Sequence, residues 1–386
     1  MNNWKKIKIE EVCSFINGYA FDSNKYVQNG IQVIRITNVQ KGYISDTDKK
    51  FYKEEKELER YKLIEDDLLI SLTGNVGRVG VIKSENLPAY LNQRVSCVRI
   101  KNNNLLNKRF LFNFLNSDSF EKTCIKNSKG IAQKNISTVW LREIKIPLPL
   151  MEEQKKIAAR LDAVSDLLAK QKQLLAEQDT LIQSTFYDMF GEHQLSQQKG
   201  QWNKISDVAV IAGGSTPKTQ TPEYWDGDLN WFTPAELENC SWYVYSSQRK
   251  ITKAGVKSCH LEEFPINTVL LSSRAPIGKL AIARETFYCN QGFKNIICGE
   301  TVNPIYLYHL LMYNINYMKS LGKGATFKEI SKKIVEDIKI PVPPLELQEK
   351  FAAIVKQIES EKSKIKSAIA ETQTLFNALM AEYFEE

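Results

Sequence analysis

A proline-rich phrase occurs twice in this chain, as IKIPLPLMEEQKKIA at residues 144–158 and as IKIPVPPLELQEKFA at residues 338–352. Nine of its fifteen positions are identical, and the copies lie 194 residues apart in a chain of 386. Three further phrases recur in the same order: a Gly-centred turn at residues 71–82 and 272–283, an Asn-Gln pair at 92–93 and 290–291, and a loop at 128–137 and 322–331. A period of about 190 residues is too long for a solenoid repeat, so the sequence predicts a tandem duplication of a globular unit.

The residues that follow each proline phrase predict a long helix. Residues 152–190 contain no Gly or Pro, and their apolar residues recur at alternating intervals of four and three, the seam of a coiled coil. Adding 194 reproduces the same seam after the second copy. The seam residues are Ile157, Leu161, Val164, Leu168, Leu175 and Ile182 in the first helix, and Phe351, Val355, Ile358, Ile365, Ile369 and Phe376 in the second. Polar residues at seam positions (Gln171, Gln178, Lys362 and Thr372) are expected to lower stability while fixing register.

Upstream of each proline phrase the composition is that of strands and loops. Short β-rich runs such as IQVIRIT and VSCVRI alternate with Gly, Asn and Pro turns, and one helix is expected late in each half, around residues 107–126 and 304–320. Two seams in one chain would most simply pair as an antiparallel rod, about 58 Å long at 1.5 Å per residue. The predicted fold is therefore α+β, with two tandem-duplicated units separated by two long antiparallel coiled-coil helices in a pseudo-twofold dumbbell. The expected boundaries are 1–146 for the first unit, 147–192 for the central helical region, 193–340 for the second unit and 341–386 for the C-terminal helical region.

Composition excludes several classes of protein. Hydrophobic residues make up 43% and charged residues 25% of the chain, as in soluble globular proteins, and no apolar run is long enough for a membrane helix. The N-terminus lacks the apolar core of a secretion signal, so we expect a cytoplasmic protein without a membrane partner. Seven scattered cysteines without CxxC spacing fit reduced thiols, and none of the three histidines has a second ligand at metal spacing. We expect no metal site.

Charge and duplication together favour DNA as the partner. The net charge of +7 is a mild excess that favours a polyanion. A duplicated unit held at a fixed separation suits a target that itself presents two sites. Double-stranded DNA is such a target, because half-sites recur along the duplex at defined axial distances.

Ordered phrases in both halves resemble the specificity subunit of type I restriction-modification systems. In the second half the series begins with GGSTPKTQTPEYWDGDLNWFTPAEL at residues 213–237 and continues through LLSSRAPIGKLAIA, CNQGFKNI, GKGATFKEIS and the proline phrase. The first half matches through NGYAFDSNKYVQNGIQVIRITNVQKGYIS at residues 17–45 and its own proline phrase. The resemblance covers essentially the whole chain, and its specificity lies in the ordered series being present twice.

The resemblance implies a non-catalytic role in a larger complex. It implies two target-recognition domains, each reading one half of a bipartite asymmetric site in DNA. The helical regions would set the spacer and dock two modification (methyltransferase) subunits, which methylate adenine at N6. Restriction subunits can join such a complex and add ATP-driven cleavage. On this scheme S-adenosylmethionine, ATP and magnesium bind to the partner subunits, and this chain holds no cofactor.

The sequence supplies no catalytic residue of its own. It contains no GxxxxGK[ST] phosphate loop and no GxGxxG in a βαβ context. The phrase NPIY at residues 303–306 lacks the second proline of the adenine methyltransferase motif. It is typical of a helix start, with Asn303 as N-cap and Pro304 at the first helical position.

Candidate DNA contacts come from the turns and loops that the halves share. Base edges need amides or bidentate donors, whereas phosphates take Lys, Arg and hydroxyl groups. The candidates are Asn38, Gln40, Lys41, Thr73, Asn75, Arg78, Lys129, Gln133, Lys134, Lys218, Ser273, Arg274, Lys279, Lys323, Thr326 and Lys328. Gly77 and Gly278 are expected to adopt positive φ or to permit a close backbone approach. The alternative is a hairpin turn with solvated charges for the turns, and an exposed linker for the loops.

Two other functions stay open at this stage. One is a structural adapter that clamps proteins between two binding domains on a rod, which duplex binding that weakens steeply with salt would exclude. The other is a self-sufficient modification enzyme, which the missing cofactor and catalytic motifs disfavour. Such an enzyme would methylate DNA without a partner.

Overall fold

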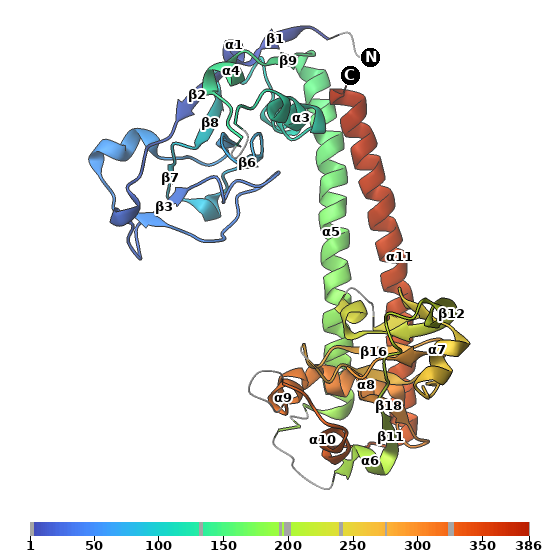
Figure 1. The fold of residues 1–386 in the computed structure, drawn as a ribbon. Coiled ribbons are helices and arrows are strands. Elements are labelled where there is room, and N and C mark those ends of the chain that lie inside the picture. Colours follow the sequence, from blue (N-terminus) through green and yellow to red (C-terminus); the bar gives the residue numbers. More distant parts are fainter. Residues whose placement is uncertain are drawn as a thin grey trace. The chain divides into compact units, whose positions relative to one another are not determined.

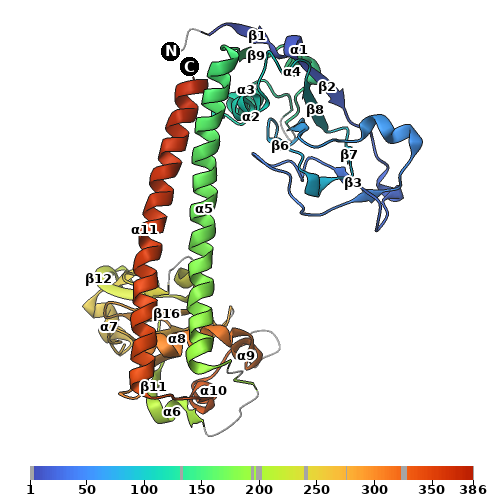
Figure 2. The same ribbon diagram turned by 180° about the vertical axis from the view of Figure 1, so that it is seen from behind.

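The computed structural model of the protein describes residues 4–130, 134–192, 195–196, 202–238, 242–274, 276–322 and 328–385. The chain forms two compact units: unit 1 comprises Met1–Gln173 with Lys366–Glu386, and unit 2 comprises Leu174–Ile365. Each unit combines small sheets and short helices with a segment of both long helices, α5 (Met151–Phe190) and α11 (Leu345–Phe384) (Figures 1 and 2). Each unit is therefore completed by helical residues from the other half of the duplication.

Unit 1 contains two small sheets. The first is antiparallel, in the order β2 (Cys13–Asn17), β8 (Val95–Ile100), β5 (Leu68–Ser71) and β6 (Val79–Val81). The second has the order β4 (Phe51–Tyr52), β3 (Ile31–Ile34) and β7 (Ala89–Leu91). All four residues of β5 are buried, which explains why its sequence LLIS is a continuous run without the polar–apolar alternation of a half-exposed strand.

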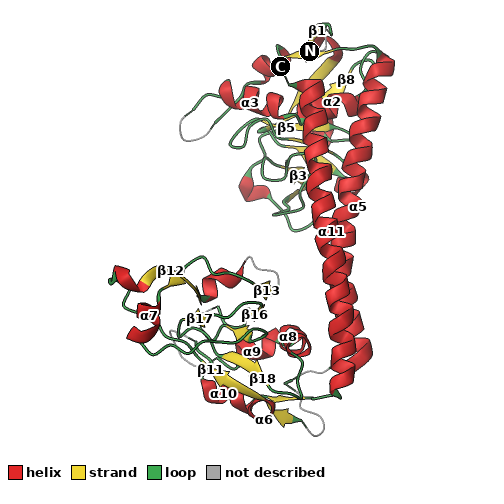
Figure 3. Cartoon of the chain, turned by 90° about the vertical axis from the view of Figure 1, so that its right-hand side faces the viewer, coloured by secondary structure: helices red, strands yellow, loops and turns green. Residues whose placement is uncertain are grey.

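Unit 2 repeats this topology. Its larger sheet has the order β11 (Ala209–Ala212), β18 (Asn295–Cys298), β15 (Val269–Leu271) and β16 (Leu280–Ala283), with β13 (Tyr243–Val244) added in parallel beside β16. Its smaller sheet has the order β14 (Lys250–Ile251), β12 (Trp225–Phe232) and β17 (Tyr288–Cys289) (Figure 3). The shared strand order confirms the predicted duplication and the α+β class.

Each half has two short helices where the sequence predicts one. Unit 1 has α2 (Lys108–Leu115) and α3 (Asp118–Lys126), and unit 2 has α8 (Pro304–Tyr313) and α9 (Ile315–Ser320). The break in unit 1 lies at Ser117, whose hydroxyl donates to Phe114 O at 2.7 Å and accepts from Phe120 N at 3.2 Å. A serine bonded in this way ends one helix and caps the next, so the prediction of a single helix was wrong.

The remaining elements are short. They are the helices α1 (Ile9–Val12), α4 (Thr138–Arg142), α6 (Ile205–Val208), α7 (Lys253–Ser258) and α10 (Lys332–Asp337), and the strand pairs β1 (Lys6–Lys8) with β9 (Lys145–Pro147) and β10 (Asn203–Lys204) with β19 (Lys339–Ile340). Strands β9 and β19 are the IKIP portions of the repeated phrase. Each pairs with a strand near the start of its own half and so closes that unit.

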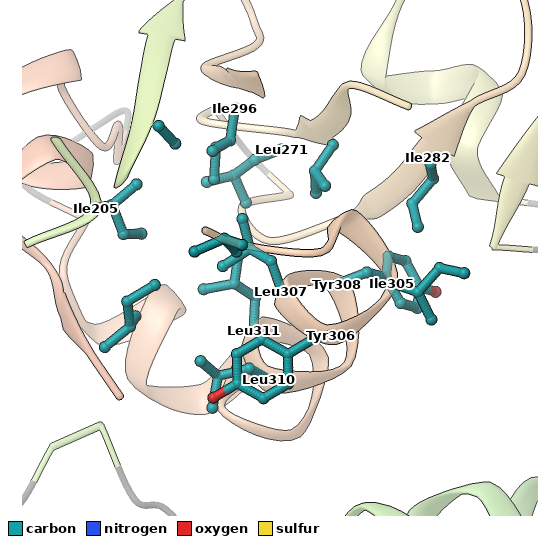
Figure 4. Packing of buried hydrophobic residues seen from close by; sticks show 14 of the residues in the cluster. Ile205, Leu271, Ile282, Ile296, Ile305, Tyr306, Leu307, Tyr308, Leu310 and Leu311 are labelled. Carbon is teal, nitrogen blue, oxygen red and sulfur yellow. The ribbon is translucent and has the colours of Figure 1, made fainter. Parts of the chain in front are cut away.

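The core of unit 2 forms where α8 covers the larger sheet. Leu307, Leu310 and Leu311 lie with Leu271 and Ile296 in one buried cluster (Figure 4). Helix α8 is apolar on nearly all sides, as expected for a helix packed between a sheet and the long helices. The matching cluster of unit 1 gathers Phe110, Leu111 and Phe114 of α2 with Leu68 and Ile70 of β5.

The twelve apolar seam residues of the long helices are all buried or half-buried. Within unit 1, the end of α11 meets the start of α5 and α2: Arg160 Nη1 donates to Tyr383 Oη at 3.0 Å, and Phe384 packs on Phe110 and Phe114. Within unit 2, Phe186 and Phe190 near the end of α5 pack on Phe351 near the start of α11. The helix segments therefore pair antiparallel inside each unit. Among the described residues, no helix has the length and apolar character needed to cross a membrane.

One polar seam residue forms ion pairs. Lys362 Nζ lies 2.6 Å from Asp179 Oδ1 across the seam and 2.6 Å from Glu359 Oε1 on its own helix. Burial works against the charge of Lys362, but these two carboxylates raise its pKa overall. Gln171 and Gln178 each keep a buried Oε1 without a hydrogen-bond partner among the described residues. Both arrangements match the expected role of polar seam residues, which trade stability for a defined register.

The glutamine of the repeated phrase locks each long helix to its unit. Gln154 Oε1 accepts from Asn107 N at 2.8 Å, and its Nε2 donates to Leu105 O at 3.0 Å and to Pro149 O at 2.9 Å. Gln348 makes the same three bonds in unit 2, to Asn303 N, Thr301 O and Pro343 O. Both glutamines are fully buried, and Asn303 is the predicted N-cap, with Oδ1 accepting from Ile305 N at 2.9 Å. This shared lock explains why the phrase is repeated.

Replacing Gln154 with Ala should lower the free energy of unfolding by about 3 kcal/mol, because three backbone groups in buried or part-buried surroundings lose their partner at once. Glu153→Ala, one residue away and exposed, should change it by less than about 0.5 kcal/mol. Urea unfolding of the full chain measures both. Equal effects from the two variants would contradict the lock.

Candidate nucleic-acid interface

A serine organises the Gly-centred turn between β5 and β6. Ser71 Oγ donates to Asn75 O at 2.5 Å and accepts from Arg78 N at 3.0 Å, while Gly77 N donates to Ser71 O at 2.9 Å. In unit 2, Ser272 makes the corresponding bonds to Pro276 O, Lys279 N and Gly278 N, at 2.8, 2.8 and 3.0 Å. All of these partners are backbone atoms, so the turn keeps its shape whatever side chains it presents.

Two glycines are required by this geometry. Gly77 has φ +79° and Gly278 has φ +90°, a region that L-residues with a side chain rarely adopt. A Cβ on Gly77 would lie 2.6 Å from Cys124 Cβ on α3, and a Cβ on Gly278 would lie 2.6 Å from Ile315 Cδ1 on α9. The predicted positive φ and close approach are therefore both confirmed.

Backbone hydrogen bonds join this turn to two loops that are distant in sequence. In unit 1, Leu72 N donates to Arg94 O, Ile136 N to Leu72 O, and Gly74 N to Lys134 O, at 2.8 to 3.0 Å. In unit 2, Ser273 N donates to Gly292 O and Ile330 N to Ser273 O, at 2.8 and 2.9 Å. We call these joined segments the three-loop edge: residues 72–75, 92–94 and 134–136 in unit 1, and residues 273–274, 290–292 and 328–330 in unit 2.

The two edges differ in charge. Next to the edge of unit 1 lie Arg94, Lys129 and Lys134, which are exposed and form no ion pair within the described part of the chain. Thr73 Oγ1 donates to Asn135 Oδ1 at 3.3 Å there. At the same place in unit 2, Arg274 Nε lies 3.1 Å from Glu329 Oε2, and Lys294 Nζ lies 3.4 Å from Glu329 Oε1. The edge of unit 1 is thus an uncompensated cationic surface, whereas that of unit 2 is partly neutralised.

Several predicted contacts lie on or beside these edges. Thr73 and Asn75 are at the turn of unit 1, with Lys129 and Lys134 on the loop bridged to it. Arg274 and Lys328 take the matching places in unit 2. Lys218 is exposed on the GSTPKT loop, whose backbone is fixed because Trp225 Nε1 donates to Lys218 O and Trp231 Nε1 to Ser215 O, both at 3.2 Å. Gln133, Lys323 and Thr326 lie outside the described residues.

Two of the predicted base contacts were wrong. Asn38 is fully buried: its Oδ1 accepts from Arg35 N, and its Nδ2 donates to Ser45 O and Thr47 O. Ser273 is also fully buried, with Oγ donating to Gly292 O at 3.0 Å. Asn38 satisfies backbone groups of its own loop and Ser273 satisfies one of a neighbouring loop, so neither side chain presents a free group to a ligand.

Other predicted cations are occupied within their unit. Arg78 Nη1 donates to Gln40 Oε1 at 2.8 Å, and Lys279 Nζ donates to Pro234 O at 2.9 Å. Lys41 Nζ lies 2.6 Å from Asp118 Oδ1 and 3.2 Å from Glu121 Oε2. Burial works against the charge of Lys41, but these bonds raise its pKa overall. The three cations and Gln40, which is also a predicted contact, are thus held in place by the fold and would have to exchange partners to contact DNA.

The list of predicted contacts omitted three residues that the structure places at exposed positions. Gln93 and Arg94 follow the Asn92 turn on the edge of unit 1, and the repeated Asn-Gln pair was the signal that could have found them. Arg249 Cζ lies 3.5 Å from the ring centroid of Trp225, a cation–π contact that fixes an exposed guanidinium beside the GSTPKT loop. No signal in the sequence pairs Arg249 with Trp225.

Within the described residues no group of three or more His, Cys, Asp and Glu side chains could hold a metal ion. Burial raises the pKa of the Cys124 and Cys289 thiols to about 12, so neither of these two is poised for chemistry. Among the described residues the edges present cationic and hydrogen-bonding side chains, which suit the recognition of a ligand.

Comparisons with known proteins agree with that picture. The family described as "Type I restriction modification DNA specificity domain" matches residues 1–178 and 199–372. A type I restriction enzyme specificity subunit, MjaIX of Methanocaldococcus jannaschii, is 41% identical over 43% of this chain and 40% of its own length. The putative MjaX specificity subunit of the same organism is 26% identical over 92% of this chain and 87% of its own length. The crystal structure of the type I restriction-modification S subunit from M. genitalium has a TM-score of 0.59 at 16% identity, covering 100% of this chain and 98% of that one, which shows a shared fold.

The turn geometry makes a testable distinction between two glycines of positive φ. Gly77→Ala should destabilise the chain by about 3 kcal/mol, because backbone strain adds to the clash with Cys124. Gly74→Ala should cost only about 1 kcal/mol, since the nearest atom to its Cβ is Ile36 Cδ1 at 3.9 Å. Urea unfolding gives both values, and the packing argument fails if Gly74→Ala proves the more damaging of the two.

Proposed function

This chain belongs to the type I restriction-modification DNA specificity family, and on that premise we propose that each unit binds one half of a bipartite site in double-stranded DNA through its three-loop edge. The chain acts as the specificity subunit of the complex. It supplies the sequence specificity, while its partner subunits carry out the chemical reactions. The observation that carries this proposal is the recurrence of one backbone scaffold with two different sets of exposed side chains.

The edge of unit 1 suits the phosphate backbone. Arg94, Lys129 and Lys134 are exposed and free of ion pairs within the described residues, so a phosphate that contacts them displaces no carboxylate. Thr73 and Asn75 on the same edge carry the hydroxyl and amide groups that read base edges. Asn75 is exposed at the tip of the turn, and its side chain faces the guanidinium of Arg78.

The difference between the edges supports two different half-sites. Where unit 1 places Thr73 against Asn135, unit 2 places Arg274 against Glu329. A guanidinium can pair with guanine and a carboxylate can accept from cytosine N4, whereas a hydroxyl and an amide suit other base edges. One backbone scaffold with two side-chain sets therefore suits an asymmetric sequence.

The long helices provide surfaces for protein partners. Each unit leaves leucines exposed on its helical segments: Leu167 and Leu375 in unit 1, and Leu174 and Leu181 in unit 2. Leu174 and Leu181 are seven residues apart, so they lie on one face of α5, beside the seam. We propose that two methyltransferase subunits dock on these helices and methylate adenine at N6 in the cytoplasm. In this proposal they bind S-adenosylmethionine, and restriction subunits that join them use ATP and Mg²⁺.

Removing the free cations of unit 1 tests the DNA proposal. The variant Arg94→Ala/Lys129→Ala/Lys134→Ala should bind duplex DNA more weakly, and its slope of log K against log salt should fall by about 2 to 3, because each lost phosphate contact contributes about 0.9. The control Lys156→Ala/Lys172→Ala/Lys364→Ala removes the same charge from exposed helix positions and should leave the slope within about 0.5 of the native value. Fluorescence anisotropy at several salt concentrations measures both, and identical slopes for the two variants would count against the edge.

Docking on α5 is tested by placing charge on its exposed face. Leu174→Glu/Leu181→Glu should weaken assembly with the methyltransferase subunit at least tenfold, because two leucines that would be buried become carboxylates. The control Ala176→Glu/Thr180→Glu adds the same charge on the opposite, exposed face and should assemble normally. Sedimentation velocity of the mixtures distinguishes the two outcomes. Loss of assembly in the control as well would mean that charge alone disrupts the complex.

A further inference from the structure

Unit 1 contains a cavity that none of the roles above uses. It measures about 590 Å³, within the size range of ligand pockets, and lies where α2 faces the end of α11, the end of β6 and the loop at Lys41 and Gly42. Phe112, Val81, Phe376 and Met380 give it apolar walls, and Asn113 and Asn116 of α2 also line it. All of the lining residues belong to unit 1.

Each of these two asparagines has one side-chain atom without a hydrogen-bond partner among the described residues. Asn113 is 5% exposed, and its Nδ2 makes no hydrogen bond within the described residues. Asn116 donates through Nδ2 to Phe112 O at 3.0 Å, but its buried Oδ1 has no partner either. Buried amide groups are normally satisfied. Both atoms are themselves buried, so the contacts that the cavity offers come from its aromatic and aliphatic walls.

The equivalent place in unit 2 can be identified from the helix caps. Asn107 and Asn303 both start their helices and both donate through the backbone to the glutamine lock, so α2 and α8 align residue by residue. Phe112 then corresponds to Tyr308, and Asn113 to His309. His309 is likewise buried, at 4% exposed, with neither ring nitrogen bonded among the described residues.

In unit 2 an indole fills this place. The ring of Trp242 lies 5.9 Å from that of Tyr308 and 5.7 Å from that of His309, and stacks on Tyr243 at 3.9 Å, all between centroids. Trp242 precedes β13, and its carbonyl accepts from Ile282 N on β16 at 2.7 Å. An aromatic ring supplied by the segment beside the edge strand is therefore part of the packed form of this site.

In unit 1 a glycine takes the place of Trp242, and the aromatic residue that follows it, Tyr43, is exposed. Gly42 lies beside β6, with its N–H donating to Val79 O at 2.8 Å, and a Cβ built on Gly42 would meet no atom within 4 Å. Phe112 is partly buried against the core of unit 1, and the guanidinium of Arg109 lies over its ring, with Cζ 4.7 Å from the centroid. The place that Trp242 fills in unit 2 is therefore open in unit 1.

Of the three cations that line the cavity, Lys41 and Arg109 are already paired with carboxylates, whereas Lys83 is exposed and has no ion pair among the described residues. Lys41 is paired with Asp118 and Glu121, and Arg109 is paired with Asp162 through three short contacts. Asp118 and Glu385 add negative charge to the lining. One side of the rim consists of Ser165 on α5 and of Gln373 and Asn377 on α11, on the helices offered to protein partners.

We propose that the cavity of unit 1 receives an aromatic side chain, tryptophan or tyrosine, presented by a protein partner that docks along α5 and α11. The ring takes the place that Trp242 occupies in unit 2 and packs against the apolar walls formed by Phe112, Val81, Phe376 and Met380. This inference rests on the proposed function, because the partner is a subunit docked on the helices. It adds that docking is unequal, since Trp242 already fills the matching place among the described residues of unit 2.

Indole is the probe for the cavity itself. Ligand-observed NMR on the full chain should detect indole binding with a dissociation constant on the order of 1 mM, as for a fragment of this size. Asn377→Trp, which places a ring at the rim, should weaken indole binding at least tenfold. Asn377→Ala also loses the bond from Gln373 Nε2, 2.9 Å long, but leaves the cavity open and should bind indole as the native chain does. Equal indole binding by the native chain and Asn377→Trp would overturn the site.

The partner is tested by native mass spectrometry with the methyltransferase subunit. The native chain and Asn377→Ala should each bind two copies, whereas Asn377→Trp should need at least tenfold more subunit to bind the second. Two copies bound equally well by all three chains would overturn the aromatic anchor and leave the proposed function standing. Failure of the native chain to bind any copy would overturn the proposed docking itself. In unit 2 the place of Asn116 is taken by Met312. If the variant Asn116→Met binds indole less well than the native chain yet assembles normally, the aromatic anchor is also excluded.

Discussion

The apolar seam shared by α5 and α11 is the constraint on which the rest of the structure depends. Within unit 1 it brings Tyr383 and Phe384, the last turn of the chain, onto α2 and the start of α5. Within unit 2 it brings Phe351 against Phe186 and Phe190. Neither globular half therefore closes its core alone, because each borrows a helical segment from the other half. The glutamine lock joins each long helix to the rest of its unit, since Gln154 and Gln348 bond to the helix cap at Asn107 or Asn303.

Backbone hydrogen bonds hold each three-loop edge, so its backbone shape does not depend on the side chains that it presents. Ser71 and Ser272 bind only main-chain atoms of their turns, and the bridges to the neighbouring loops are also main-chain bonds. A network of this kind tolerates almost any side chain at the positions it does not use. This explains how Thr73 and Asn135 can stand where unit 2 has Arg274 and Glu329 without a change of fold. It is also the arrangement that a protein needs if it is to read two unrelated half-sites.

The two units diverge most behind the edges, where α2 and α8 face the long helices. Unit 2 fills that space with Trp242. Unit 1 has Gly42 and a cavity instead. Trp242 directly precedes β13, a strand that the larger sheet of unit 1 does not have among the described residues, so the difference belongs to this segment while the other four strands and the helix caps of the two units match. A duplicated chain can thus present unequal surfaces to partners while keeping equal recognition scaffolds.

The sequence by itself determined the duplication, the long helices, their seam and the conformation of Gly77 and Gly278, because each depends on a local pattern of period, spacing or backbone freedom. Tertiary structure alone decided which polar side chains are available. Asn38 and Ser273 look like base readers in sequence, yet Asn38 is bonded to backbone groups of its own loop and Ser273 to one of a neighbouring loop. The meeting of Thr73 with Asn135, 62 residues apart, and the contact of Arg249 with Trp225 likewise required the fold. Periodicity depends on residues that are close in the sequence. The hydrogen-bond partners of a polar side chain instead depend on which backbone groups the fold places next to it.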